Sequence, residues 1–261
     1  MKKQLATINS IWIGSNLGPV HVACLKSFIN HGHKVVLHSY KCPQDKPEKV
    51  EFADANLLIP EDQIVRHRET GSFSLFSNLL RYELLRKELG LYVDCDIFCL
   101  KPIIDAEYIV GFEDNNFINN AVLKLPSKCP ALMDLCSIRD NNKYFPPWLS
   151  RTKRWKHRFK GLIRMGGRIE DLPWGSTGPK AITYFFQEYD LLDFVQPIDI
   201  FYPVNYDSTN LLLDQELEYT DLITNRTMCI HLWNSLFLDK LDFNQLPNCP
   251  LKELVCLGGI D

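Results

Sequence analysis

The 261-residue chain lacks several features that would assign it to a specialised class of protein. No stretch approaches the ~20 apolar residues of a membrane-spanning helix. We also find no internal repeat, no low-complexity tract and no linker that would separate two domains. The nine cysteines include no Cys-x-x-Cys pair, which argues against a zinc site or a disulfide framework and favours reduced thiols. We therefore expect one globular domain over residues 1–261, located in the cytoplasm.

Acidic residues are missing from residues 141–168, which hold nine of the 29 Lys and Arg residues. Because the remainder of the chain is acidic, this basic block indicates an anionic partner. Residues 151–168 could contact anionic lipid, with Trp148, Trp155 and Phe159 as interfacial anchors and the protein on the inner face of a membrane. They could instead bind a phosphorylated or acidic acceptor glycan, or form a solvated loop. We do not expect nucleic acid, because no known binding motif accompanies the charge.

The first half of the chain alternates predicted strands with predicted helices, which indicates an α/β sheet with parallel strands. The N-terminal segment reads as a first strand and not as a signal peptide, because polar residues break its apolar run. Strands are expected at 5–13, 33–40, 91–100, 107–113 and 117–125, and helices at 78–89, 130–138 and 179–188. Residues 141–172 would form a basic helical or loop insertion in this domain.

Two acidic residues, Asp94 and Asp96, interrupt the apolar run LYVDCDIFCL. Buried carboxylates cost several kcal/mol each unless a cation or hydrogen-bond donors meet them. Ligands of open α/β sheets lie beyond the carboxyl ends of the strands, and the two-residue period of a strand would place both carboxylates on one side. Oxygen ligands suit Mg²⁺ or Mn²⁺, which often bind substrate phosphates as well. We expect this pair to bind such a cation.

The segment SNLLRYELLRKELGLYVDCDIFCLKP, residues 77–102, resembles the signature of the DxD sugar transferases of glycosyltransferase family 32. Looser matches follow the order of that family: IWIG (11–14), INNAVL (118–123), TGP (177–179) and HLWNS (231–235). The resemblance implies a GT-A-type mixed sheet flanked by helices. It also implies a metal-dependent, retaining transfer of a hexose or N-acetylhexosamine from a nucleoside diphosphate sugar, with UDP favoured. The acceptor would be a surface glycan such as lipooligosaccharide or capsule.

The same resemblance implies roles for individual residues. Asp94, Asp96 and His231 would hold Mn²⁺ or Mg²⁺, with Asp94 also near the ribose. Arg81 and Asn78 would act beside the donor sugar, although relatives usually carry Asp where this chain has Asn78. Further substrate contacts would come from Trp12, which would stack on the base, and from Asn119, Asn120, Thr177, Gly178, Asn234 and Ser235.

Two other functions remain open. The protein could bind a nucleotide sugar without catalysis. It could also be a phosphatase of the haloacid dehalogenase type, which uses Asp-x-Asp with Mg²⁺. That motif normally lies on the first strand and continues with Thr or Val, whereas here Asp96 precedes Ile97 and Phe98.

Overall fold

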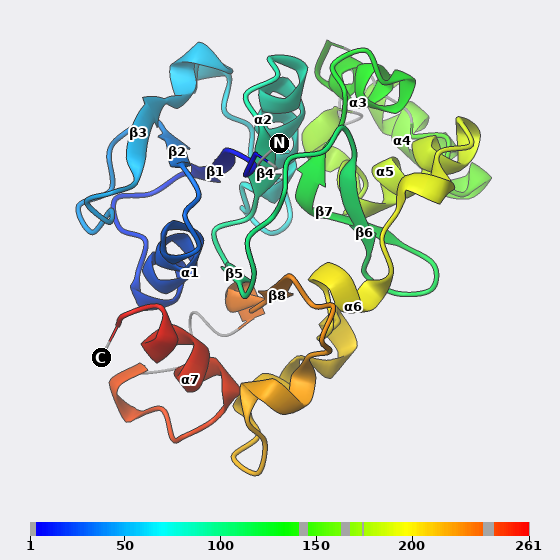
Figure 1. Ribbon diagram of the computed structural model, residues 1–261. Coiled ribbons are helices and arrows are strands. Elements are labelled where there is room, and N and C mark those ends of the chain that lie inside the picture. The colour runs from blue at the N-terminus through cyan, green and yellow to red at the C-terminus, as the bar shows by residue number, and fades with distance from the viewer. Residues whose placement is uncertain (1–3, 141–145, 163–167, 174, 237–242, 261) are drawn as a thin grey trace.

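The computed structural model describes residues 4–140, 146–162, 168–173, 175–236 and 243–260. Its centre is a six-stranded mixed sheet in the order β3-β2-β1-β4-β7-β6 (Figure 1). The strands are β1 (Ile8–Trp12), β2 (Val35–Ser39), β3 (Glu51–Asp54), β4 (Leu91–Val93), β6 (Ile109–Phe112) and β7 (Ile118–Lys124). Strands β1 to β4 pair in parallel, and β7 runs antiparallel to both of its neighbours, β4 and β6. The predicted α/β mixed sheet is confirmed.

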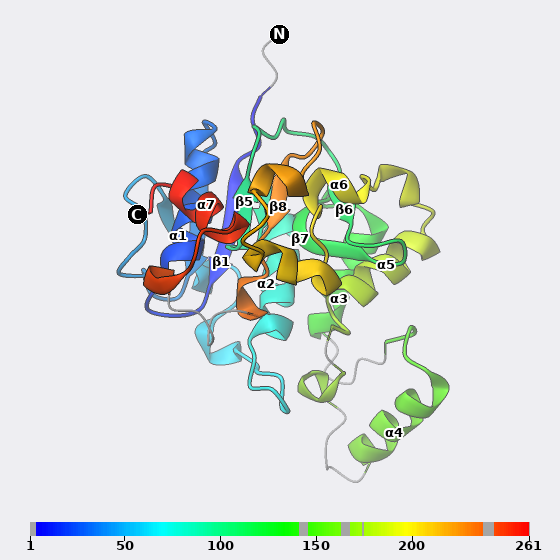
Figure 2. The ribbon, with the colours of Figure 1, turned by 90° about the horizontal axis from the view of Figure 1, so that it is seen from below.

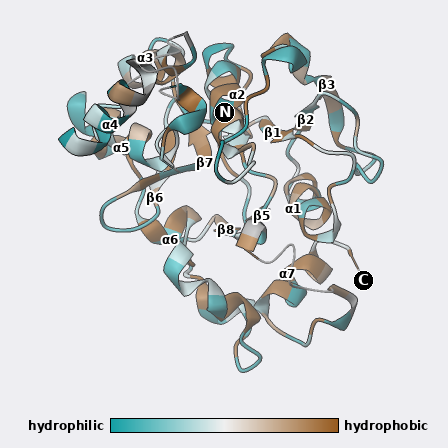
Figure 3. Ribbon diagram, turned by 180° about the vertical axis from the view of Figure 1, so that it is seen from behind, coloured by the Kyte–Doolittle hydropathy of each residue, from teal (hydrophilic) through white to brown (hydrophobic). Residues whose placement is uncertain are grey.

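Helices cover both faces of this sheet, so its strands are apolar on both sides. Tyr92 of β4 packs into the core with α2, α3 and α5, whereas its neighbours Leu91 and Val93 pack into the core with α1. Figure 3 shows the central strands as mostly hydrophobic. The helices are α1 (Pro19–Asn30), α2 (Ser74–Arg86), α3 (Pro130–Asp140), α4 (Arg151–Leu162), α5 (Pro179–Glu188), α6 (Ile198–Phe201) and α7 (Pro250–Leu257).

A second, two-stranded sheet pairs β5 (Ile97–Cys99) with β8 (Cys229–His231) in antiparallel register. The single strand expected over 91–100 is therefore wrong. The chain turns after β4, where the amide of Ile97 donates to the carbonyl of Asp94 at 3.1 Å. The two apolar halves of the run then join different sheets, and the acidic residues lie in the turn between them.

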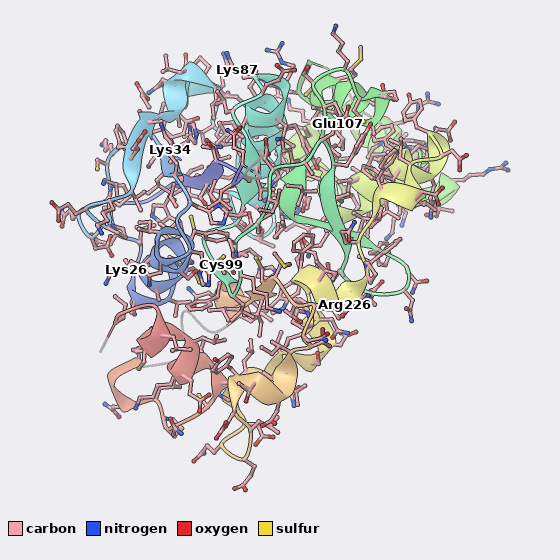
Figure 4. All side chains as sticks on the ribbon, in the orientation of Figure 1. Lys26, Lys34, Lys87, Cys99, Glu107 and Arg226 are labelled. Carbon is pink, nitrogen blue, oxygen red and sulfur yellow. The ribbon has the colours of Figure 1, made fainter. Side chains whose placement is uncertain are left out.

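Short 3-10 helices connect the remaining segments. They span Ala55–Leu57, Glu61–Gln63, Ile169–Asp171, Leu192–Phe194, Tyr206–Leu213, Tyr219–Leu222, Asn234–Leu236 and Phe243–Gln245. An ion pair of 2.6 Å between Arg226 and Asp199 fastens the segment before β8 to α6; Arg226 is labelled in Figure 4.

The basic segment expected at 141–172 contains α4, which extends away from the body of the molecule (Figure 2). Residues 141–145 and 163–167 of that segment lie outside the described part of the chain. Among the described residues, no helix combines the length and the hydropathy that crossing a bilayer requires.

Candidate active site

The two acidic residues lie at the carboxyl end of β4, which pairs in parallel with β1 on one side and antiparallel with β7 on the other. The amide of Asp94 donates to the carbonyl of Ala121 on β7 at 2.8 Å, which fixes the start of the turn. Cys95, between the acids, is buried, and its thiol donates to the carbonyl of Ile11 at 3.5 Å. The carboxylates keep solvent contact, with side-chain exposures of 29% for Asp94 and 15% for Asp96. The turn therefore brings both acids to one surface of the site, as we predicted, although by a different geometry.

Arg81 of α2 is the cationic partner of Asp94. Its Nη2 atom donates to Oδ1 of Asp94 at 2.6 Å, and the hydroxyl of Tyr92 donates to the same oxygen at 2.5 Å. The guanidinium carbon also lies 4.3 Å from the centre of the Tyr92 ring. Burial and the Asp96 carboxylate raise the pKa of Asp94, and Arg81 opposes that shift. Because both contacts use Oδ1, the second carboxylate oxygen stays available to a ligand.

Asp96 is held by the strand that it faces. Nε2 of His231 lies 3.2 Å from Oδ1 of Asp96, and the amide of Asn234 donates to Oδ2 at 3.1 Å. Burial alone would raise the pKa of Asp96, but His231 holds it well below its ordinary value. The same pairing raises the pKa of His231 against the opposing effect of burial. His231, which we expected to share a metal with the two acids, contacts Asp96 directly.

One atom from each of Asp94, Asp96 and His231 lies within 4.8 Å of the other two, so the three side chains could hold a metal ion. Carboxylate oxygens suit Mg²⁺ and Mn²⁺, and an imidazole is an accepted additional ligand of transition metals. Nδ1 of His231 is buried and has no hydrogen-bond partner in the described part of the chain. Nε2 is the ring nitrogen that faces Asp96, so a cation shared by the two side chains would be held through Nε2 and not through Nδ1. The donor set therefore fits the expected cation.

Asn78, Asn120 and Thr177 meet in a buried network. Nδ2 of Asn78 donates to Oγ1 of Thr177 at 3.1 Å, and Nδ2 of Asn120 donates to Oδ1 of Asn78 at 2.9 Å. The hydroxyl of Tyr82 joins them by donating to the carbonyl of Thr177 at 2.7 Å. A Cβ atom on Gly178 would lie 3.0 Å from Nδ2 of Asn78, so glycine permits this close approach. Three elements, α2, β7 and the start of α5, thus contribute predicted site residues to one cluster.

Trp12 and Asn234 converge on His21 at the other side of the site. The rings of Trp12 and His21 are 4.5 Å apart between centroids, and Nδ2 of Asn234 lies 3.1 Å from Nε2 of His21. The other ring nitrogen of His21 lies 2.5 Å from the carbonyl of Leu17, so Asn234 donates if Nδ1 carries the proton. The indole Nε1 of Trp12 is buried without a partner among the described residues. The side chain of Ser235 lies outside what the structure describes.

Asn119 differs from Asn120 in its surroundings. Its Nδ2 donates to Oε2 of Glu113 at 2.7 Å, and its Oδ1 accepts from the amide of Ala121 at 2.7 Å. Burial raises the pKa of Glu113, while Asn119 and His231 oppose that shift. The influence of His231 places Glu113 in the electrostatic environment of the candidate metal site. Asn119 is therefore oriented by the protein itself, and Asn120 joins the Asn78 network.

Sequence reasoning missed Glu113 and His21. Both follow from the rule that sites gather at the carboxyl ends of parallel strands. Glu113 comes directly after β6, which runs in the same direction as β4, and His21 is in the first turn of α1 after β1. A cavity of about 610 Å³ beside β6 is lined by Phe112 and Asp114 but by none of the predicted site residues.

Comparisons with known proteins find relatives at low sequence identity. No family model matches the chain. Lactosylceramide 4-alpha-galactosyltransferase of Mus musculus is 24% identical over 183 residues, and that of Rattus norvegicus is 24% identical over 182 residues. These matches cover 65% of this chain but 44% and 43% of the relatives, so the chain spans less than half of their length. The solved structure of PaToxG glycosyltransferase has a TM-score of 0.44 and 14% identity, and covers 74% of this chain and 72% of its own.

The described fold is a mixed α/β sheet with helices on both faces. The DxD acids lie where β4 leaves the central sheet to meet β8 through β5. In open α/β folds this edge is where ligands bind.

Proposed function

We propose that the protein is a metal-dependent glycosyltransferase of the family 32 kind. It would move a hexose or N-acetylhexosamine from a nucleoside diphosphate sugar, with UDP favoured, to a glycan or glycolipid acceptor with retention at the anomeric carbon. The observation that carries this proposal is the cluster of Asp94, Asp96 and His231, whose ligand atoms approach within 4.8 Å of one another. The names of the two curated relatives, which refer to lactosylceramide and galactose transfer, support a glycolipid acceptor.

The three residues of the cluster would bind the cation in different ways. Asp96 and His231 would be its main ligands, because their ligand atoms, 3.2 Å apart, are close enough for one cation to contact both. Asp94 would add its second oxygen or bind the ribose, since Arg81 and Tyr92 occupy the first. A bound Mn²⁺ or Mg²⁺ would neutralise charge on the departing diphosphate.

The remaining site residues would bind and orient the donor. Trp12 would stack on the base, and its Nε1, which has no partner among the described residues, would donate to the ribose. The network of Asn78, Asn120 and Thr177 would border the sugar, with amide groups that both donate and accept. Gly178, Asn119, Asn234 and Ser235 would complete the pocket. The acceptor would be lipooligosaccharide, capsule or a related surface glycan, and a cytoplasmic location remains the prediction for the protein.

The test is nucleotide binding followed by donor turnover. Calorimetric titration with UDP should show binding that depends on MnCl₂, and incubation with a panel of UDP- and GDP-sugars should release the nucleotide from at least one. Asp96→Asn should lose both properties. Asp62→Asn, which removes an exposed acid on a 3-10 helix away from the cluster, is the matched control and should keep them.

Each rival function predicts a different result. Binding of nucleotide sugars with no turnover across the panel, even with glycan acceptors present, would indicate a non-catalytic binding protein. Release of phosphate from simple phosphate esters would indicate the phosphatase. Binding of UDP that is unaffected by manganese and by Asp96→Asn would overturn the metal site itself.

A further inference from the structure

Helix α4 differs from every other long helix of the described chain in its position. It lies apart from the layers that cover the sheet and projects beyond the end of the molecule at which β1 terminates (Figure 2). The carboxyl edge of the parallel strands, with the candidate site, is at that same end. In this position α4 can contact a large surface, such as that of a partner, without rearrangement of the rest of the protein.

The helix exposes two large aromatic side chains side by side. Trp155 is 66% exposed and Phe159 is 48% exposed, although such residues are normally covered. They are one helical turn apart, and their rings stack with centroids at 5.5 Å and an interplanar angle of 13°. Because residues four apart share one helix face, the two rings form a continuous apolar patch. Trp148 is not part of it, since its ring packs 5.4 Å from Tyr184 and 5.6 Å from Phe185 of α5.

Cations surround the aromatic patch, and the helix contains no acidic residue to neutralise them. At 100° per residue, Arg151 lies on one side of the Trp155–Phe159 face and Lys156 on the other, and Lys153 lies on the back. All three are exposed. A polar helix with an aromatic stripe bordered by Lys and Arg is the pattern of helices that lie in a membrane interface.

We propose that α4 docks the protein on the surface of a bilayer that contains anionic phospholipid. Trp155 and Phe159 enter the boundary between headgroups and acyl chains, where aromatic rings are enriched, and the cations of α4 contact the headgroups. The charge of the helix is complementary to that surface, and its aromatic pair matches a bilayer better than a soluble polyanion, which offers no apolar phase. This proposal does not depend on the enzymatic activity.

The experiment is sedimentation of the full chain with vesicles. Vesicles with 30 mol% phosphatidylglycerol in phosphatidylcholine should bind it at least tenfold more tightly than pure phosphatidylcholine, and binding should weaken as salt rises. Arg151→Glu/Lys156→Glu, which reverses the two cations that flank the aromatic face, and Trp155→Ala/Phe159→Ala should each reduce the partition coefficient about tenfold. Lys41→Glu/Lys49→Glu, with the same charge change at exposed positions elsewhere, and Phe52→Ala, an exposed aromatic of β3, should bind like the wild type.

Three outcomes would overturn the proposal. The first is equal binding of the protein to anionic and neutral vesicles. The second is a partition coefficient equal to that of the wild type for both double variants of α4. The third is a loss on charge reversal but not on removal of the aromatics, together with retention on a heparin column, which would identify a polyanion site instead. Circular dichroism and the melting temperature of each variant show whether it is folded, which is expected because all four side chains are exposed.

Discussion

Nη2 of Arg81 donates to Oδ1 of Asp94 at 2.6 Å across thirteen residues of sequence. The arginine is 4% exposed and the aspartate 29%, so a buried cation supports an acid that reaches solvent. This contact explains how the chain tolerates two carboxylates at the end of a buried strand. Asp94 receives its positive partner from α2, and Asp96 receives one from His231 on β8 when that ring is protonated.

Replacement of Arg81 should therefore affect both activity and stability. Arg81→Met leaves the Asp94 carboxylate without its cation, and we expect a loss of about 100-fold in kcat/KM, the usual effect of removing one aimed donor. The free energy of unfolding should fall by about 2 kcal/mol, less than for a fully buried pair because Asp94 keeps water contact. Arg81→Lys should be intermediate, since an ammonium cannot stack on Tyr92 in the same way. Nucleotide release and urea unfolding measure these effects, with Lys87→Met, at the exposed position directly after the same helix, as the control. Near-normal turnover by Arg81→Met would refute the role.

Manganese should stabilise the folded protein through the three-residue cluster. A ligand present at 100 times its dissociation constant adds about 2.7 kcal/mol, which for a chain of this size corresponds to about 5–10 °C in melting temperature. His231→Ala and Asp96→Asn should lose most of that shift, while Asp62→Asn should keep it. Thermal melts with manganese and with excess EDTA provide the comparison. A shift that survives in His231→Ala would remove that residue from the ligand set.

Asn78→Asp should change donor selection while the protein still folds. The carboxylate can accept from Asn120 as the amide does, and the hydroxyl of Thr177 can turn to donate to it. A new charge at this buried position should cost about 1–3 kcal/mol of stability and alter the order of preference among donor sugars. Thr177→Val, which removes the hydroxyl at nearly constant volume, is the companion variant. If a screen of donors gives the same order for wild type and Asn78→Asp, Asn78 is not part of the sugar pocket.

Glu113→Gln should weaken binding of the cation and keep the hydrogen bond to Asn119. A glutamine oxygen can still accept from Nδ2 of Asn119, but one negative charge near His231 is lost. We expect manganese affinity to fall about threefold to tenfold, as for removal of one nearby charge in a partly aqueous site. Glu113→Ala, which also releases the Asn119 amide, should raise the KM for the donor in addition. Asp114→Asn is the control, because that neighbour caps the turn at Asn116 and Phe117. Equal manganese affinity for Glu113→Gln and Asp114→Asn would contradict this assignment.

Stability should depend on pH through the buried His38 of β2. Burial lowers the pKa of His38 to about 4, and its Nε2 lies 2.9 Å from Oδ1 of Asn9. The unfolded chain takes up this proton near pH 6.5, so its uptake increasingly favours unfolding as the pH falls from about 6.5 to about 4. Between pH 7.5 and pH 5.5 the wild type should lose about 1.4 kcal/mol more than His38→Gln, which keeps a donor for Asn9 but does not titrate. Urea unfolding at the two pH values gives this difference, and equal losses would refute it.

The sequence predicted those features that depend on local pattern. The spacing of Asn78, Tyr82, Leu85 and Leu89 predicts an inward stripe on the helix expected at 78–89. The first three are buried on α2, which begins at Ser74 and not after Ser77. Leu89 lies beyond the end of α2 and is 39% exposed, so that part of the prediction is wrong. Arg81 is buried as well, because α2 lies between the sheet and α3 and has little free surface. A helical wheel alone cannot show that arrangement, since it depends on where α3 packs.

The features that the sequence did not predict depend on pairing between distant segments. The turn at Asp94 and Asp96 exists because β5 leaves β4 to pair with β8, which lies more than 100 residues further on. The apolar run itself contains no break other than the two acids. Glu113 likewise has no motif, and its position beside the candidate site depends on β6 running in the same direction as β4, with β7 antiparallel between them.

The pairing of β5 with β8 also determines when the candidate site can form during synthesis of the chain. Asp96 and Asn234 touch although 138 residues separate them, and in the register of the two strands Ile97 faces His231. During synthesis the six strands of the central sheet emerge from the ribosome long before β8 does. On the proposed function, the nascent chain would hold a nearly complete α/β body with no affinity for manganese. Binding of manganese would then begin only after the C-terminal third has packed against the rest of the protein.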